Sequence, residues 1–262
     1  MSNLPSPSQE LGQHFLVDEN IVRVIGRLAD LQPDDVVLEV GPGQGVLTAF
    51  LAERARLVHA VELDRRLELH LTERFGGTDN VRLHFADALQ LDPAVLDPPP
   101  SKLVANLPYN VATPIVVESL DGLPSVSSWC VMVQREVADR FFAQPRTKAY
   151  GAVSVLLQLA TERTGFHAVS REVFRPRPNV DSALVAFRRR DERPPVPWSE
   201  LKRVVEAAFA HRRKQLPNSL ELAGLAGREQ AEAALAAIGR PPTTRAEELA
   251  PVEFVELAAA LR

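Results

Sequence analysis

The chain has 262 residues, of which 45% are hydrophobic and 24% charged, a composition that is typical of a globular protein and excludes a disordered or fibrous one. Its single cysteine excludes a disulfide framework and a cysteine-rich metal site, and no apolar stretch reaches membrane-spanning length. Met1 to Glu10 are polar and lack the apolar core of a signal peptide, so we expect a cytoplasmic protein without a metal.

The net charge of −4 hides an uneven distribution. Residues 1–100 carry 8 lysines and arginines against 16 acidic residues, whereas residues 135–190 carry 11 against 5 and residues 201–220 carry 5 against 1. Local positive charge of this kind favours contact with a polyanion. The alternative is a set of solvated surface charges without a partner.

Predicted strands and helices alternate through the first half of the chain. A helix is expected to begin at Asp18 or Asn20 and to continue through Leu28, because apolar residues recur there with helical spacing. Strands are then expected at 36–40, 57–62, 81–85, 103–105 and 128–133, with helices at 46–55, 65–74 and 112–120. This alternation predicts a Rossmann-like, doubly wound α/β sheet with mostly parallel strands.

The pattern changes after the fifth strand. Helices are expected near 136–143 and 149–160, followed by strands at 164–169 and 183–188 with no helix between them, which indicates an antiparallel edge. A proline-rich segment at 193–197 predicts a linker. We therefore predict a catalytic domain over residues 1–192 and a small all-helical domain over residues 193–262, with helices near 199–210, 212–223, 228–238 and 245–261.

Three segments at successive strand ends predict a nucleotide-cofactor site. Gly41-Pro42-Gly43-Gln44-Gly45 follows the first core strand and opens a helix, so its backbone can approach a ligand closely. Glu62 ends the next strand, where a carboxylate can accept both hydroxyls of a ribose, and Asp87 follows the third strand, where it can accept from an adenine amino group. Open α/β sheets bind ligands at this edge.

Two cofactors compete for this site. NAD is the weaker candidate because Val46 stands where the dinucleotide fingerprint requires its third glycine, and no partner for hydride transfer is evident. S-adenosyl-L-methionine carries its own leaving group, so the protein needs to position reactants more than to supply an acid or base. The residues favour S-adenosyl-L-methionine and leave a nicotinamide oxidoreductase as the alternative.

Asn106-Leu107-Pro108-Tyr109 ends the fourth strand and predicts a pocket for a planar amino group. Such an amine is a poor nucleophile, and acceptors aimed at its two N–H bonds favour the geometry of the transition state. The Asn106 side-chain oxygen can be one acceptor and a backbone carbonyl beside Pro108 the other, in a loop that proline stiffens. Tyr109 offers a ring on which a flipped base can stack. A plain strand-to-loop turn is the alternative.

Six motifs come in the order found in the ribosomal RNA adenine dimethyltransferases, a family that the chain resembles from about residue 9 to its end. The motifs are Gly12-Gln13-His14-Phe15-Leu16, Glu39-Val40-Gly41-Pro42-Gly43, Asn106-Leu107-Pro108-Tyr109-Asn110, Lys148-Ala149-Tyr150-Gly151, Val180-Asp181-Ser182 and Phe209-Ala210-His211-Arg212-Arg213-Lys214. The resemblance is to the small-subunit type. It implies a seven-stranded methyltransferase sheet. It also implies the transfer of two methyl groups to N6 of each of two adjacent adenosines in the 3′-terminal hairpin of 16S rRNA, a modification linked to small-subunit biogenesis. We expect the protein to act as a monomer.

The resemblance also implies roles for individual residues. The cofactor contacts would be His14, Leu16, Gly41, Gly43, Glu62, Asp87 and Asn106. The target base would be handled by Asn106, Leu107 and Pro108, with Tyr109 and Phe174 enclosing it. Together with the local positive charge, the motifs point to RNA contacts by Arg135, Arg140, Arg146, Lys148, Arg212, Arg213 and Lys214.

Alternatives and departures accompany this resemblance. Phe174 could be a core aromatic, and Arg212 to Lys214 could be a solvated helix face. His14 stands where the family usually has asparagine, Asn179 replaces a common lysine, and Gln9 to Leu11 lack the usual basic residues. Two other functions stay open: a large-subunit (23S) rRNA adenine N6-methyltransferase, and a non-catalytic ribosome-assembly factor.

Overall fold

A computed structural model describes residues 7–8 and 11–262. The sequence lacks the usual basic residues at Gln9, Glu10 and Leu11. Of these three, Gln9 and Glu10 lie outside the described residues. Within the described part of the chain, no helix is long and apolar enough to cross a bilayer.

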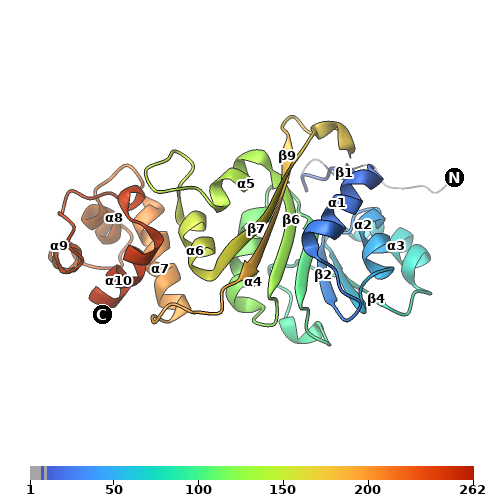
Figure 1. Ribbon diagram of the computed structural model, residues 1–262, viewed down its shortest axis with the longest axis horizontal. Coiled ribbons are helices and arrows are strands. Elements are labelled where there is room, and N and C mark those ends of the chain that lie inside the picture. Colours follow the sequence, from blue (N-terminus) through green and yellow to red (C-terminus); the bar gives the residue numbers. More distant parts are fainter. Residues whose placement is uncertain (1–6, 9–10) are drawn as a thin grey trace. The chain divides into compact units, whose positions relative to one another are not determined.

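The main sheet contains seven strands and has the predicted doubly wound order (Figure 1). Their spatial order is β4 (Val81–Phe85), β3 (Leu57–Glu62), β2 (Val36–Val40), β5 (Lys102–Asn106), β6 (Ser128–Gln134), β9 (Ser182–Arg189) and β7 (Thr161–Val169). The pairs β4–β3, β3–β2, β2–β5 and β5–β6 are parallel, whereas β9 runs antiparallel to β6. The predicted mostly parallel α/β fold with an antiparallel edge is confirmed.

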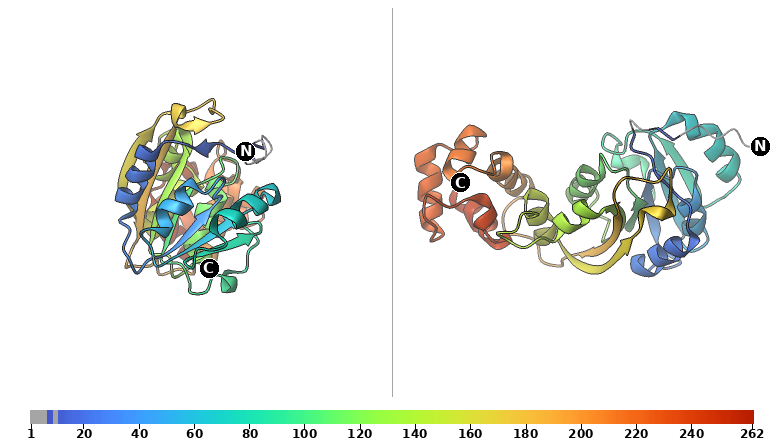
Figure 2. Two further views of the ribbon diagram at one scale, coloured as in Figure 1. Left: turned by 90° about the vertical axis from the view of Figure 1, so that its right-hand side faces the viewer. Right: turned by 90° about the horizontal axis from the view of Figure 1, so that it is seen from above.

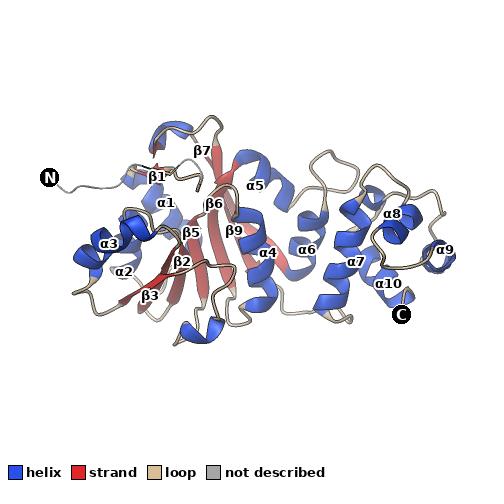
Figure 3. Cartoon of the chain, turned by 180° about the vertical axis from the view of Figure 1, so that it is seen from behind, coloured by secondary structure: helices blue, strands red, loops and turns tan. Residues whose placement is uncertain are grey.

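Helices cover both faces of this sheet. The helix α1 (Glu19–Ala29) packs on β5, β6 and β9, and it also contacts α2 (Val46–Ala52), which packs on β3. Figure 3 shows α4 (Ala112–Gly122) in front of the sheet, with α1 behind it. The helix α3 (Glu68–Phe75) extends a short 3-10 turn at Arg65–Leu67, so the predicted helix over 65–74 is two joined pieces.

The parallel register brings the carboxyl ends of five strands, β2 to β6, to one edge. Val40 pairs with Val61, Glu62 pairs with Phe85, and Asn106 pairs with Met132. All five residues of β2 are buried, as expected for a central parallel strand covered on both faces. The glycine turn, Glu62 and Asn106 therefore follow neighbouring strands at the same edge.

A second, two-stranded sheet pairs β1 (Phe15–Leu16) with β8 (Phe174–Arg175). Its register places Phe15 opposite Arg175 and Leu16 opposite Phe174. The sequence analysis did not predict this sheet, because two residues are too few to show an alternating pattern. The pairing fixes the N-terminal segment beside the segment that precedes β9.

The chain divides into two compact units, and the division differs in one segment from the predicted boundary at residue 192. The first unit contains residues up to 138 together with 163–189, and the second contains 139–162 together with 190–262. The second unit therefore includes the end of α5 (Arg135–Phe141) and all of α6 (Ala152–Ala160). The helix α6 packs against C-terminal helices, which explains why it groups with them.

Within the second unit, α6 contacts α7 (Trp198–Ala210) and α10 (Pro251–Ala260), and α8 (Leu216–Leu222) contacts α7 and α9 (Arg228–Ala237). Figure 2 shows the helices from α7 onwards in orange and red. The predicted helix over 212–223 begins later, at Leu216, because Pro217 occupies its first turn, where proline is tolerated. The predicted helix over 245–261 is a 3-10 turn at Ala246–Glu248 followed by α10.

Candidate active site

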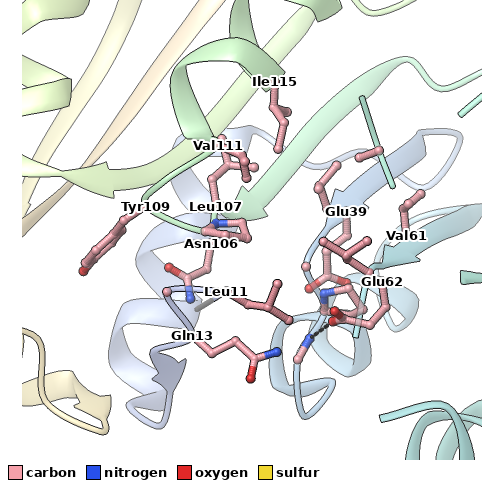
Figure 4. Close-up of a pocket in the computed structure, with 18 of the residues that line it drawn as sticks. Leu11, Gln13, Glu39, Val61, Glu62, Asn106, Leu107, Tyr109, Val111 and Ile115 are labelled. Atoms are coloured by element: carbon pink, nitrogen blue, oxygen red, sulfur yellow. Dashed lines mark hydrogen bonds between the residues drawn. The ribbon is translucent and has the colours of Figure 1, made fainter. Parts of the chain in front are cut away.

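One cavity in the first unit is lined by all seven residues predicted to contact the cofactor and by Leu107, Pro108 and Tyr109. Figure 4 shows Glu62 at one end of this cavity and Tyr109 at the other, with Asn106 between them. The cavity lies at the carboxyl edge of the sheet, where β2, β3 and β5 end. The fold thus brings together, around one cavity, the residues that the sequence motifs singled out.

The glycine turn after β2 uses backbone conformations that favour glycine. Gly41, Gly43 and Gly45 have φ angles of 74°, 57° and 79°. A Cβ atom on Gly43 would lie 2.8 Å from the Phe15 ring, so a larger residue there would push against the segment that covers the turn. The turn is therefore shaped for close approach of backbone to a ligand, as a cofactor cradle requires.

Glu62 is held by backbone donors at the end of β3. Its two carboxylate oxygens accept from the N–H groups of Gly43, at 3.1 Å, and Asp64, at 2.8 Å. Burial raises the pKa of the Glu62 carboxyl, and these two hydrogen bonds act against that shift. The carboxylate keeps further acceptor capacity for a ligand hydroxyl. The geometry fits a ribose-binding carboxylate.

Asp87 lies beyond β4, where it lines the same cavity. Its side chain accepts from the Leu89 backbone N–H and from the Gln90 side-chain amide, both at 3.0 Å. These bonds fix the carboxylate while leaving acceptor capacity. The exposed side chains of Leu63 and Leu89 line the cavity beside Glu62 and Asp87, and they provide apolar surface for a planar base.

Asn106 is oriented by its own amide group. Its Nδ2 donates to the backbone carbonyl of His14 over 3.1 Å, which leaves Oδ1 as a free acceptor. Figure 4 shows this oxygen on the side that faces Tyr109. A Cβ atom on Gly41 would lie 3.3 Å from the Pro108 ring, so the glycine turn and the Asn106–Tyr109 segment are in direct contact. The Asn106–Tyr109 segment and the glycine turn are therefore neighbours.

Tyr109 is held at its hydroxyl and by a ring contact. Its hydroxyl lies 2.6 Å from Ser182 Oγ, and the His14 ring lies 5.2 Å from it, centroid to centroid, at a 33° tilt. His14 is held in turn by donation from Nδ1 to the Pro176 carbonyl over 2.8 Å. Burial raises the pKa of the Tyr109 hydroxyl, which is therefore neutral near pH 7. The histidine that departs from the family pattern thus supports the predicted stacking ring.

The structure does not bring Phe174, predicted to enclose the target base, to the cavity. Its ring is 0% exposed and lies in the apolar cluster that includes Val22, Ile25 and Leu184, and Phe174 does not line the cavity. The pairing of β8 with β1 turns the side chain into the core under α1. Of the predicted aromatic pair, Tyr109 and Phe174, Tyr109 is the one that lines the cavity.

Sequence analysis missed Glu39 as an individual site residue. Its side chain lines the cavity, is 1% exposed, and has one oxygen, Oε2, without a hydrogen-bond partner among the described residues. Burial raises the pKa of this carboxyl to about 8. An unpartnered buried oxygen is costly unless a ligand satisfies it. The signal was the single acidic residue within the otherwise apolar strand 36–40.

Leu11 is one of the residues that line the cavity. Figure 4 shows its side chain between Asn106 and Glu62, and the neighbouring Gln13 donates to Asp64 Oδ2 over 2.9 Å. The N-terminal segment is therefore part of the wall of the site.

The predicted RNA-binding residues lie in both units. Arg135 is in the first unit, where its guanidinium lies 5.1 Å from the centroid of the Phe166 ring. The other predicted residues, from Arg140 to Lys214, are in the second unit. Arg146, Lys148, Arg213 and Lys214 are exposed, whereas Arg212 is partly buried and paired with Glu247 at 2.9 Å.

Two further predictions concern the single cysteine, Cys130, and the absence of a metal site. Cys130 is 1% exposed in the sheet core, and burial raises the pKa of its thiol to about 12, so it is a core residue. Among residues 7–8 and 11–262, no three histidine, cysteine or acidic side chains gather as a metal site would require.

The sheet order, the glycine turn and the Asn106 pocket define an α/β methyltransferase. The model of the family "Ribosomal RNA adenine dimethylase" matches residues 6–258, and the chain belongs to this family. It is an enzyme that dimethylates adenine in ribosomal RNA, as the resemblance implied.

Curated relatives extend over nearly the whole chain. A ribosomal RNA small subunit methyltransferase A from Rubrobacter xylanophilus is 51% identical over 97% of this chain and 94% of its own length. The protein of that name from Geobacillus kaustophilus is 42% identical over 97% of this chain and 90% of its own length.

Solved structures share the fold. The crystal structure of a 23S rRNA methyltransferase, ErmE, is 32% identical with a TM-score of 0.66, and the match covers 94% of this chain and 99% of that one. A dimethyladenosine transferase from Plasmodium falciparum is 22% identical with a TM-score of 0.78, covering 93% and 96% of the two chains. At that identity the second match shows the fold alone.

Proposed function

We propose that the protein uses S-adenosyl-L-methionine to add two methyl groups to N6 of each of two adjacent adenosines in the 3′-terminal hairpin of 16S rRNA. The names of the curated relatives support the small ribosomal subunit as its substrate. We further propose that it works in the cytoplasm as a monomer without a metal ion, as a step in small-subunit biogenesis.

The observation that carries the proposal is the fixed orientation of Asn106. Its Nδ2 is used by the His14 carbonyl, so Oδ1 can accept from the amino group of adenine. The contact between Gly41 and Pro108 keeps this acceptor beside the cofactor cradle. An adenine N6 held there by Asn106 and a Leu107 or Pro108 carbonyl has its lone pair localised towards the donor, which favours attack.

The residues of the cavity fit the proposed donor. Glu62 would accept the ribose hydroxyls and Asp87 the adenine amino group, while the unpartnered oxygen of Glu39 suits a cationic ammonium group. When bound, the donor supplies a methyl group on a positively charged sulfur. The donor would give this methyl group to the N6 nitrogen held by Asn106 and the Leu107 or Pro108 carbonyl, its sulfur keeping the electron pair of the broken carbon–sulfur bond, and the N6 proton would leave to solvent.

Tyr109 would bind the face of the target base. Its ring is held by Ser182 and His14, so it is ordered before RNA arrives. A target adenosine must leave its base stack to reach the cavity, and an ordered ring offsets part of the cost of unstacking.

A methyl-transfer assay with labelled donor tests the proposal and separates it from its rivals. Purified small and large ribosomal subunits lacking the modification would each be incubated with the protein, and the RNA digested to nucleosides for mass spectrometry. We expect N6,N6-dimethyladenosine from the small subunit alone. Label on the large subunit would favour the activity that the ErmE match suggests, and no label on either would favour a non-catalytic assembly factor.

A further inference from the structure

The guanidinium of Arg212 makes its contacts within the second unit. Nε donates to Glu247 Oε2 over 2.9 Å, Nη1 donates to the Lys148 carbonyl over 2.8 Å, and Nη2 donates to the Thr147 carbonyl over 3.1 Å. All three nitrogens are engaged, and the Glu247 carboxylate neutralises the charge. A side chain used in this way is poorly suited to bind a phosphate directly.

The carbonyls that Arg212 holds belong to a loop without regular structure between α5 and α6. The loop has two more anchors on the segment around the 3-10 turn Ala246–Glu248. The Arg146 N–H donates to the Glu247 carbonyl over 2.7 Å, and the Tyr150 hydroxyl donates to the Leu249 carbonyl over 2.8 Å. Tyr150 is 0% exposed. Three segments distant in sequence therefore meet around the Arg212–Glu247 pair.

The backbone at Arg146 adopts a left-handed conformation, which is unfavourable for a residue other than glycine. Its φ angle is 67°, a region that residues other than glycine rarely adopt. Such a conformation persists where surrounding contacts determine it. Here the contacts come from the Glu247 carbonyl on one side and from Arg212 on the other.

The same contacts bring exposed cations together. Arg146 and Lys148 belong to the short segment whose carbonyls Arg212 binds, and Arg213 and Lys214 follow Arg212 directly in the chain. All four are exposed. Two pairs of positive charges, separated by more than 60 residues of sequence, are thus joined through one partly buried ion pair.

We propose that Arg212 and Glu247 are positioning residues that hold the 146–148 loop so that Arg146 and Lys148 bind RNA phosphates together with Arg213 and Lys214. This inference rests on the proposed function of the protein as an rRNA enzyme. It assigns Arg212 a different role from its neighbours: it acts through the loop and not on phosphate. It also assigns Glu247, an acidic residue, a favourable role in binding a polyanion.

Glu247→Gln gives a test in which the sign of the effect decides. Removing a negative charge beside cations strengthens RNA binding if only net charge matters. If Glu247 positions the loop, binding weakens by about fivefold for each phosphate that the loop no longer reaches at about 0.15 M salt, and the salt dependence becomes shallower. The control is Glu221→Gln, which removes an exposed charge elsewhere in the same unit. Equal or tighter binding by Glu247→Gln than by this control would overturn the inference.

Arg212→Lys provides a second test because it keeps the charge and loses the three-way donation. We expect it to weaken RNA binding about as much as Glu247→Gln does, whereas a phosphate-binding role predicts near-normal binding.

Trypsin cleaves after Arg146 and Lys148, so limited digestion without RNA reports on the conformation of the 146–148 loop directly. Both variants should be cut there faster than the wild type at an unchanged melting temperature. Unchanged cleavage would contradict the positioning role, while a wild type that does not bind small-subunit RNA would instead contradict the proposed function.

Discussion

The cavity of the first unit and the basic surface of the second unit, formed by Arg146, Lys148, Arg213 and Lys214, hold their polar groups by different means. In the cavity, Glu62 and Asn106 stand at the ends of β3 and β5, the two strands that flank β2, and are fixed by bonds to backbone atoms. On the basic surface, Lys148 and Arg213 are exposed, and a side-chain ion pair organises the segments that carry them. Strand register determines the first arrangement, and long-range side-chain contacts determine the second.

The two regions should therefore respond differently to change. Substitutions in the cavity act on groups shielded from water, so they should alter turnover with little dependence on salt. Substitutions on the basic surface act on screened charges, so they should alter RNA affinity in a salt-dependent way.

The largest expected effect comes from Asn106→Ala. Removing the oriented acceptor should lower kcat by about 10²- to 10³-fold, the range seen when one preorganised group at a reacting centre is removed. Donor binding, measured by calorimetry, should change by only a few fold because Glu62 and Asp87 remain. Methylation at a near-normal rate would show that the Asn106 pocket does not orient the amine.

Tyr109 should have the next largest effect. Tyr109→Ala should lower kcat/KM by about 10- to 100-fold, since stacking of one base on an aromatic ring contributes about 1–3 kcal/mol. Tyr109→Phe keeps the ring and removes only the hydrogen bond to Ser182, so it should lose no more than a few fold. If the two variants lose activity equally, the hydroxyl and not the ring matters.

Glu39 should affect a different quantity, the stability of the fold as a function of pH. Its pKa is raised from about 4.5 to about 8 in the folded protein, so between these values the folded state holds a proton that the unfolded state has released. Its contribution to stability therefore falls as pH rises through this window, by at most about 1.4 kcal/mol per pH unit. Denaturant titrations of Glu39→Gln should show a flatter pH profile than the wild type, and parallel profiles would exclude the assignment.

Lys148→Gln should have the smallest effect, confined to RNA affinity. The loss of one exposed cation should weaken binding about fivefold at about 0.15 M salt and reduce the salt slope by about 1, with donor affinity unchanged. Binding titrations at three salt concentrations measure both quantities. A loss that did not depend on salt would place Lys148 outside the set of residues that bind phosphate.

Most of the fold and the cavity could be predicted from the sequence because strand ends are readable in it. Buried runs located β2, β3 and β5, and parallel pairing then required Gly41, Glu62 and Asn106 to share one edge. Glu39 escaped notice as a site residue because a strand pattern alone does not tell which face meets a ligand.

Residues that depend on distant contacts were harder to predict. Phe174 has the expected motif, yet the two-residue pairing of β8 with β1 buries its ring. Arg212 lies in a basic run, yet its guanidinium is used by Glu247 and two loop carbonyls. Likewise α6 groups with the C-terminal helices, although it precedes the proline-rich segment that predicted the boundary. In each case the partner is far away in the sequence.

The most direct measurement of the central claim is nucleoside mass spectrometry of unmethylated small subunits treated with the protein and labelled S-adenosyl-L-methionine, with the Asn106→Ala protein as the control. The account predicts N6,N6-dimethyladenosine at two adjacent positions of 16S rRNA with the wild type and almost none with the variant. Label on another base or atom, or equal label with both proteins, would contradict it.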